Sequence, residues 1–212
     1  MRIKICGLTR KKDVNMAVQL GADALGFILA DSPRKVSLTQ VKSLTQNISP
    51  FVDRTAVVVN PSYSKIKKIV ESNLFNYIQF HGQKEPDFLK NIRTPGLGII
   101  KAFSLQQEKD LKNVALYNNT ADYFLFDTRI NNRRGGTGQT FDWSLLEKTD
   151  NTKPYILAGG LGPKNIIAAA KKTGAKALDI NSKIETKPGK KDSILMTRLF
   201  QNLSIINKIE NK

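Results

Sequence analysis

The feature that most constrains the fold of this 212-residue chain is an eightfold alternation of short apolar segments with segments of helical spacing. The apolar segments have the length and composition of strands that are buried on both faces. They are residues 3–6, 24–29, 55–59, 77–80, 97–103, 123–126, 155–157 and 177–180. Strands that alternate with helices form right-handed βαβ units around a parallel sheet. The alternation therefore predicts an α/β protein.

The intervening segments carry apolar residues at helical spacing, and several follow a residue typical of a helix N-cap. The helical segments are centred on 14–20, 38–48, 66–70, 88–89, 111–115, 145–146, 166–170 and 194–206. The candidate caps are Thr9 or Asp13, Ser37 and Ser62. The fourth helix must be short, because it is bounded by Pro86 and Pro95 and proline is tolerated only in the first helical turn.

Eight strand–helix units in a chain of this length predict a (β/α)8 barrel (TIM barrel) at the short end of its size range. A doubly wound open sheet is the alternative, but that fold usually has five or six strands, and the GxGxxG fingerprint is absent. No linker interrupts the series, so residues 1–212 are predicted to form a single domain. The long irregular stretches, 128–139 and 181–192, each follow a strand, where barrels carry their chemistry.

The composition is that of a soluble globular protein, with 40% hydrophobic and 25% charged residues. No apolar run is long enough to cross a membrane, and the N-terminal segment lacks the apolar core of a signal peptide. The single cysteine excludes an intramolecular disulfide, and no cluster has metal-ligand spacing. We therefore expect a cytoplasmic protein with no membrane partner and no metal.

The net charge of +16, from 34 Lys and Arg against 18 Asp and Glu, suggests a polyanionic partner. However, no aromatic RNA-binding motif, zinc-finger spacing or basic arm is present. We therefore expect a lysine-rich solvated surface and no nucleic-acid partner. A nucleic-acid-binding protein without enzymatic activity is the rival, and salt-dependent binding to nonspecific DNA would identify it.

In a barrel, function is read from the residues that follow each strand. Cys6 and Asp127 occupy such positions after the first and sixth strands. A thiol whose pKa is lowered by nearby positive charge can act as a base or nucleophile. A carboxyl whose pKa is raised by partial burial can act as a general acid. The alternatives are a buried packing cysteine and a turn-capping aspartate.

A second pattern indicates an anion site after the seventh and eighth strands. Gly159 and Gly160 let the backbone approach a ligand, and a helix is expected to begin near Pro163. Asn181 and Ser182 follow the eighth strand. Barrels characteristically bind phosphate with the loops after these two strands. The pattern predicts a phosphate site, with an ordinary tight turn as the alternative.

Other strand-end residues are less specific. Arg34 could hold a carboxylate through two hydrogen bonds, or be an exposed surface arginine. His81, the only histidine, is more typical of a hydrogen-bonding residue at a strand end than of an acid or base. The segment 135–143, GGTGQTFDW, is predicted to be a flexible loop that could close over a ligand, and it lacks the Gly-Lys-Ser/Thr of a Walker A loop.

Together these motifs resemble the phosphoribosylanthranilate isomerase family. They are KICGLTR at the start, SPRKV at 32–36, QFHG at 79–82, FDTR and GGTGQTFDW within 126–143, LAGGLGPKNI at 157–166 and DINSKIETKPGKKD at 179–192. They occur in the family's order and span essentially the whole chain. The family is a (β/α)8 barrel of tryptophan biosynthesis. It converts N-(5-phosphoribosyl)anthranilate to 1-(2-carboxyphenylamino)-1-deoxyribulose 5-phosphate.

The resemblance implies a role for each candidate residue. Asp127 would be the general acid that protonates the furanose ring oxygen, and Cys6 the general base that removes the proton from C2. This Amadori rearrangement would need no metal or cofactor. The resemblance also implies a monomer or a homodimer. The implied substrate-binding residues are Arg34 for the anthranilate carboxylate, Gly159, Gly160, Asn181 and Ser182 for the phosphate, and His81 and Asp179.

The chain departs from the family after the eighth strand, where DINSKIE replaces DVSSGVE. Lys183 stands for a glycine there, and lysine adopts positive φ less freely, so the turn is expected to differ. Lys183 is a hypothetical extra charge near the phosphate. Two related barrels are the nearest rivals. The histidine-pathway isomerase has an aspartate in place of Cys6, and indoleglycerol-phosphate synthase has a lysine there and an N-terminal extension that this sequence lacks.

Overall fold

The computed structural model of the chain describes residues 1–127, 143–147 and 153–210. Eight parallel strands form a closed barrel in sequence order, and β1 pairs with both β2 and β8. The strands are β1 (Arg2–Ile5), β2 (Ala24–Ile28), β3 (Asp53–Val59), β4 (Tyr77–His81), β5 (Gly98–Ser104), β6 (Tyr123–Asp127), β7 (Tyr155–Ala158) and β8 (Ala177–Ile180). Each predicted strand is therefore confirmed within two residues at either end, and the barrel fold with it.

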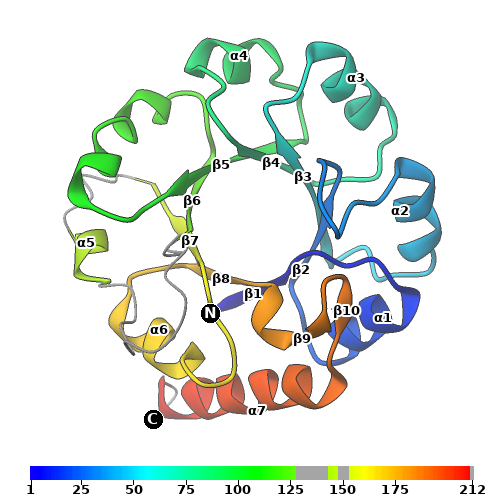
Figure 1. The fold of residues 1–212 in the computed structure, drawn as a ribbon, viewed down its shortest axis with the longest axis vertical. Coiled ribbons are helices and arrows are strands. Elements are labelled where there is room, and N and C mark those ends of the chain that lie inside the picture. Colours follow the sequence, from blue (N-terminus) through cyan, green and yellow to red (C-terminus); the bar gives the residue numbers. More distant parts are fainter. Residues whose placement is uncertain (128–142, 148–152, 211–212) are drawn as a thin grey trace.

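The helices surround the barrel (Figure 1). They are α1 (Lys11–Gln19), α2 (Leu38–Leu44), α3 (Tyr63–Glu71), α4 (Pro86–Asn91), α5 (Ser144–Glu147), α6 (Ile166–Lys172) and α7 (Ser193–Glu210). The predicted brevity of α4 is confirmed, since it has six residues and proline in its first turn. No helix in the described part of the chain is long and apolar enough to cross a membrane.

The predicted N-caps are right for two helices and wrong for the first. Ser37 forms a reciprocal capping box with Gln40, and the Ser62 side chain accepts a hydrogen bond from the Lys65 N–H. The cap of α1 is Arg10, which makes no side-chain capping bond. Thr9 and Asp13 are instead engaged with the distant C-terminal part of the chain, which local spacing does not show.

The helix predicted around 111–115 is also wrong. The chain there forms two short 3-10 helices, η1 (Glu108–Leu111) and η2 (Ala115–Tyr117). The Asp110 carboxylate accepts hydrogen bonds from the N–H groups of Gln106 and Gln107, at 2.8 and 3.0 Å. Such local side-chain bonds to the backbone compete with regular helix formation.

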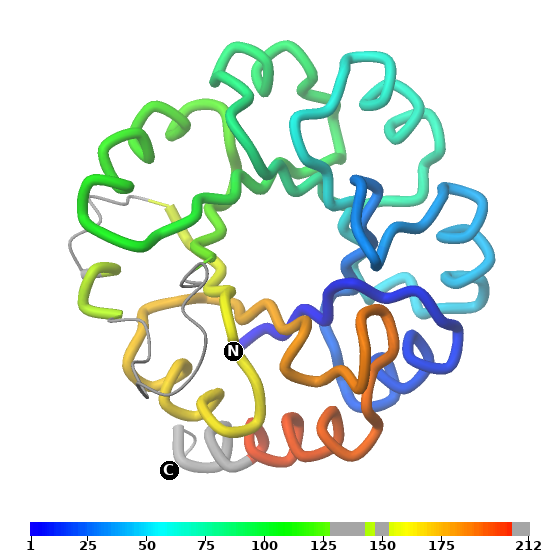
Figure 2. The backbone as a smooth tube through the Cα atoms, in the orientation of Figure 1, coloured from blue at the N-terminus to red at the C-terminus, as the bar shows by residue number. Residues whose placement is uncertain are grey.

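Residues 181–192 are regular where the sequence predicts an irregular stretch. The 3-10 helix η3 (Ser182–Ile184) leads into an antiparallel hairpin of β9 (Glu185–Lys187) and β10 (Lys190–Lys191). Figure 2 shows this segment, in orange, folded back beside the blue start of the chain. The Thr9 hydroxyl donates to the Gly189 carbonyl at 2.6 Å, and Asp13 accepts from the Lys191 N–H at 3.0 Å. The other predicted irregular stretch, 128–139, lies outside the described residues.

Two apolar clusters hold the barrel. The larger lies between the strands and the helices and buries the side chains of Phe27, Phe80, Phe124 and Phe126 completely. Burial of one such side chain contributes about 2–3 kcal/mol. The smaller cluster consists of residues from β5, β6 and β7, namely Ile100, Ala102, Leu125, Ile156 and Ala158. Buried polar side chains from β1, β4 and β8 also occur within the strands, and they lead to the site.

Candidate active site

A cavity of about 240 Å³ opens where the strands end, and it gathers most of the predicted site residues. Eight of the nine line it, and they come from the end of β1, from β4 and β6, from the loop after β7, from β8 and from the segment after β8. They are Cys6, His81, Asp127, Gly159, Gly160, Asp179, Asn181 and Ser182. The closed barrel thus brings together residues that are up to 176 positions apart, from Cys6 to Ser182.

Arg34 is the exception, because it does not line this cavity. Its Nε donates to both carboxylate oxygens of Glu185, at 2.9 and 3.0 Å, and its Nη2 donates to Oε2. The side chain is 18% exposed, so it is not the solvated surface arginine of the alternative interpretation. Its Cδ lies close to Gly7, next to Cys6. Arg34 therefore stands at the edge of the site, oriented by a buried carboxylate.

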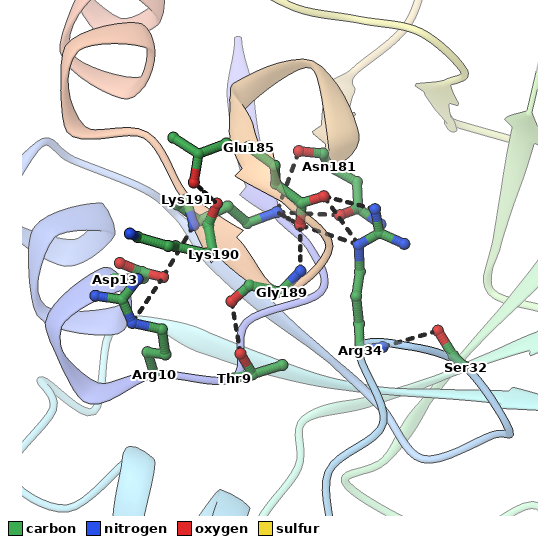
Figure 3. A network of polar contacts seen from close by, with 11 residues as sticks. Thr9, Arg10, Asp13, Ser32, Arg34, Asn181, Glu185, Gly189, Lys190 and Lys191 are labelled. Carbon is green, nitrogen blue, oxygen red and sulfur yellow. Dashed lines mark hydrogen bonds and ion pairs between the residues drawn. The ribbon is translucent and has the colours of Figure 1, made fainter.

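Figure 3 shows how Glu185 is held. Lys191, whose side chain is fully buried, donates to Glu185 Oε1 at 3.0 Å and to the main-chain and side-chain oxygens of Asn181 at 3.1 and 3.0 Å. Burial raises the pKa of Glu185, but hydrogen bonds from Arg34 and Lys191 outweigh burial and hold it below its usual value. The carboxylate therefore stays charged and links Arg34 to the segment after β8.

Cys6 is 4% exposed, and a glycine makes room for it. A Cβ atom on Gly26 of β2 would lie 2.7 Å from the Cys6 Sγ and 3.1 Å from the Lys4 Cε. Burial raises the pKa of the Cys6 thiol, while the charges of Lys4 and Lys191 lower it and that of Asp179 raises it further. Burial therefore outweighs the neighbouring cations, and the lowered thiol pKa named as the condition for a base is not found.

Next to Cys6 lies a buried polar cluster of Lys4, Gln79 and Asp179. The sequence interpretation did not predict the roles of Lys4 and Gln79. Lys4 Nζ donates to Asp179 Oδ2 and to Gln79 Oε1, both at 2.8 Å. Burial raises the pKa of Asp179, and Lys4 counteracts this effect. The available signal was strand periodicity, because Lys4 is two residues before Cys6 and Gln79 is two residues before His81, on the same strand faces.

Two of the three acidic side chains that line the cavity are electrostatically coupled, since the charge of Asp127 raises the pKa of Asp179. Asp179 Oδ1 is buried and has no hydrogen-bond partner among the described residues. A buried carboxylate oxygen without a partner costs free energy. Because Asp179 lines the cavity, this oxygen is available to a donor on a ligand.

His81 is hydrogen-bonded at the end of β4, as the simpler interpretation of this residue predicts. Its Nε2 lies 2.7 Å from the Nε2 of Gln79. The Gln79 oxygen already accepts from Lys4, so its amide nitrogen must be the donor to His81. This assignment places the proton of a neutral His81 on Nδ1.

The loops after β7 and β8 approach each other closely. Gly159 and Gly160 have φ of 96° and 64°, values that favour glycine. A Cβ on Gly162 would lie 2.7 Å from the Lys183 Cβ. Helix α6 begins at Ile166 with Asn165 as its cap, so the expectation of a start near Pro163 is wrong by about three residues. Hydrogen bonds of Asn165 with the backbones of Gly160 and Gly162 hold this turn before the helix.

Lys183 occupies η3 with negative φ, so lysine needs no left-handed conformation in place of the family's glycine. Its side chain is exposed and does not line the cavity. Of the predicted loop 135–143, only Trp143 belongs to the described residues. Within the described ranges, no group of three or more His, Cys, Asp or Glu side chains is arranged to hold a metal ion.

Comparison with known proteins identifies the family of the chain and supports its fold. The family model for "N-(5'phosphoribosyl)anthranilate (PRA) isomerase" matches residues 3–202. The chain belongs to this isomerase family. The PRA isomerase of Petrotoga mobilis is 46% identical over 206 residues, which cover 97% of this chain and 98% of that protein. Membership makes the chain an isomerase enzyme of tryptophan biosynthesis.

Solved PRA isomerase structures agree with the observed architecture. The enzyme from Thermotoga maritima superposes with a TM-score of 0.87 at 33% identity, over 96% of this chain and 98% of that one. A PRA isomerase structure with reduced 1-(o-carboxyphenylamino)-1-deoxyribulose 5-phosphate gives a TM-score of 0.84 at 31% identity with the same coverage. The two rival barrel enzymes and the open-sheet fold are thereby set aside.

Proposed function

We propose that this chain converts N-(5'-phosphoribosyl)anthranilate into 1-(2-carboxyphenylamino)-1-deoxyribulose 5-phosphate, with Cys6 as general base and Asp127 as general acid. The observation that carries the proposal is that Cys6, directly after β1, and Asp127 of β6 line one cavity. Two more strands, β7 and β8, separate them around the barrel. A small substrate between them would therefore meet one proton-transfer group on each side. The related isomerase crystallised with a reduced form of this product supports the choice of substrate.

The reaction divides into two proton transfers. Asp127, in its protonated form, gives its proton to the furanose ring oxygen while the bond from that oxygen to C1 breaks. The anthranilate nitrogen supplies the electron pair that forms the C1=N bond of the Schiff base. The Cys6 thiolate then removes the proton from C2, and the electrons form the C1=C2 bond of an enolamine. Protonation of C1 and loss of the C2 hydroxyl proton give the ketone and return the enzyme to its starting state.

This scheme requires Cys6 and Asp127 to hold one proton between them. The proton must be on Asp127 and not on Cys6 when the substrate reacts. Burial raises the pKa of the Cys6 thiol and so opposes this arrangement. The cationic side chains near the thiol, Lys4 and Lys191, favour it because they stabilise the thiolate. Formation of the thiolate therefore depends on the electrostatic surroundings of Cys6.

We propose that Arg34 binds the anthranilate carboxylate. Glu185 occupies the Nε and Nη2 of Arg34, and Nη1 has no protein partner among the described residues. A guanidinium fixed on one edge presents its remaining N–H groups in a defined direction. Its position next to Gly7 places it beside the residue that follows the proposed base.

The remaining substrate contacts follow from the lining of the cavity. We propose that the unpartnered Asp179 Oδ1 accepts a hydrogen bond from the substrate, and that His81 contacts the sugar from β4. The loops that carry Gly159, Gly160, Asn181 and Ser182 would hold the phosphate. This placement agrees with the usual phosphate site of such barrels, after strands seven and eight. No step requires a cofactor.

Turnover of phosphoribosylanthranilate, followed by loss of its fluorescence, tests the proposal. Replacement of Cys6→Ala or Asp127→Asn should each lower kcat by about 100-fold or more, because each removes a proton-transfer group. Asp87→Asn, which changes an exposed aspartate on α4, is the matched control and should keep wild-type activity. Unimpaired turnover by both the Cys6→Ala and the Asp127→Asn proteins would overturn the mechanism, provided that both fold with wild-type melting temperatures.

A further inference from the structure

We propose that Lys4 is a positioning residue for the general base, whose ammonium group donates its third proton to the Cys6 sulfur when the thiolate forms and so stabilises that form. This inference rests on the proposed function, because it assigns a supporting group to the same base. Lys4 begins the KICGLTR motif, but the motif gives it no role and the residue does not line the cavity. The residue lies one layer deeper in the barrel, where its side chain is 4% exposed.

The geometry of Lys4 leaves one of its protons for the sulfur. A lysine ammonium has three N–H donors. One donates to Asp179 Oδ2 and one to Gln79 Oε1, both at 2.8 Å. The third has no oxygen acceptor among the described residues, so it is left for the Cys6 sulfur, whose pKa the charge of Lys4 lowers. Gly26 provides the space in which the Lys4 side chain and the sulfur meet.

The other charged groups around Cys6 are committed elsewhere. From β10, Lys191 directs its ammonium at three oxygens, two of Asn181 and one of Glu185. From the loop after β2, Arg34 is paired with Glu185. From β8, Asp179 is negative and opposes the thiolate. Arg34 keeps its Nη1 donors, which we assign to the substrate carboxylate, whereas Lys4 is a fully buried cation beside Cys6 with one proton left for the sulfur.

The paired arrangement also explains why a lysine is tolerated in the barrel interior. A buried ammonium is costly unless it is paired and hydrogen-bonded. Asp179 supplies the counter-charge, and Gln79 supplies a neutral acceptor that fixes the ammonium. Formation of the thiolate completes the set of acceptors around Lys4. The energetic benefit of that third hydrogen bond is thus available only when Cys6 is ionised.

Ionisation of Cys6 can be measured directly, because it is the only cysteine of the chain. The ultraviolet absorbance of the thiolate is recorded against pH, with the Cys6→Ala protein as the baseline that removes the tyrosine signal. The Lys4→Met substitution should raise the midpoint of this titration by about one pH unit or more, the usual effect of a close opposite charge. The Asp179→Asn substitution should lower the midpoint.

A double variant keeps the test valid if the single Lys4→Met variant is too unstable to fold. Lys4→Met alone leaves the Asp179 carboxylate buried and unpaired, which is strongly destabilising. The comparison of Lys4→Met/Asp179→Asn with Asp179→Asn removes that problem, and the double variant should titrate at the higher pH. Lys101→Met is the matched control. Lys101 is equally buried on β5, but it donates to the Gly82 and Ala102 carbonyls, and the midpoint should stay at its wild-type value.

The turnover of the same proteins separates this inference from the proposed function. If Lys4 acts through Cys6, kcat/KM should fall about tenfold for each pH unit by which the midpoint rises. Identical midpoints for Asp179→Asn and the double variant would overturn the role of Lys4, whatever the activity. A shifted midpoint together with full activity of the Cys6→Ala protein would instead overturn the proposed function and leave the Lys4–Cys6 coupling intact.

Discussion

Arg34 and Glu185 show how one side chain can be prepared by another for a ligand. The two are 151 positions apart and meet because the hairpin after β8 folds back toward the loop after β2. Glu185 fixes the guanidinium and remains charged, because Arg34 and Lys191 overcome the effect of burial on its pKa. The ion pair therefore orients the Arg34 guanidinium and is not an exposed surface contact.

This arrangement predicts graded effects on substrate affinity. Arg34→Ala should raise KM about 10- to 100-fold, because a hydrogen-bonded charge contributes about 1.5–3 kcal/mol. Glu185→Gln should have a smaller effect of the same kind, because it loosens Arg34 without removing it. Lys67→Ala, at an exposed pair with Glu71, is the control and should leave KM unchanged. An unchanged KM for Arg34→Ala in steady-state assays would remove Arg34 from the binding site.

The sequence predicts the site residues that occupy strand ends, and it misses those that act through them. Cys6, Asp127 and Gly159 follow apolar runs and are visible as breaks in a pattern. Glu185 and Lys191 follow no such pattern, because Arg34 and Asp13, which hold the Glu185 side chain and the Lys191 main chain, lie in the first part of the chain. The position of Lys4 is predictable from strand periodicity, since a residue two positions before Cys6 shares its face of the strand.

Strand β2 contributes to the site through a glycine, Gly26, whose missing side chain leaves space for Cys6 and Lys4. Gly26 faces Cys6 and Lys4 across the β1–β2 ladder, and its negative φ shows that space, not backbone freedom, requires the glycine. Glycine inside a strand often marks a close approach of this kind. The sequence segment was predicted to be a strand, but the reason for its glycine depends on a neighbouring strand and was not predictable.

Gly26→Ala should therefore impair catalysis by displacing the base. The added Cβ would lie 2.7 Å from the Cys6 Sγ, so the sulfur or the strand must shift. A shift of this size should lower kcat about tenfold or more. Gly174→Ala is the matched control, since the nearest atom to its Cβ would be 3.6 Å away and it should leave kcat unchanged. The kcat of each variant is measured, and its melting temperature is recorded to show that it is folded. Equal kcat for the two variants would show that Gly26 does not position the base.

The barrel fold is the feature of this protein that its sequence predicts best. Eight alternating units leave little choice of fold, and closure follows from the pairing of β1 with β8 from Arg2↔Ala177 to Ile5↔Ile180. Closure then assembles the cavity from strands that are distant in the sequence. The hairpin of β9 and β10 was not predicted, because the contacts that order it join positions 178 and 180 residues apart.

The net charge of +16 is not confined to the surface of the barrel. Most lysines are exposed, as expected, but Lys4, Lys101 and Lys191 are buried, and two of them lie beside Cys6. Part of the positive charge thus belongs to the interior, where it favours a thiolate and an anionic substrate. A single domain over 1–212, a cytoplasmic location and a monomer or homodimer stay predictions.

The pH dependence of kcat/KM, measured beside the titration of the thiol, tests the central claim most directly. The reactive pair of Cys6 and Asp127 holds one proton, so activity must fall at high pH when that proton is lost. Burial raises the pKa of Cys6, which places this loss above the usual value for a thiol. We expect the high-pH limb of kcat/KM to coincide with the midpoint of thiol ionisation. A limb that lies well below that midpoint would contradict the assignment of Cys6 as the base.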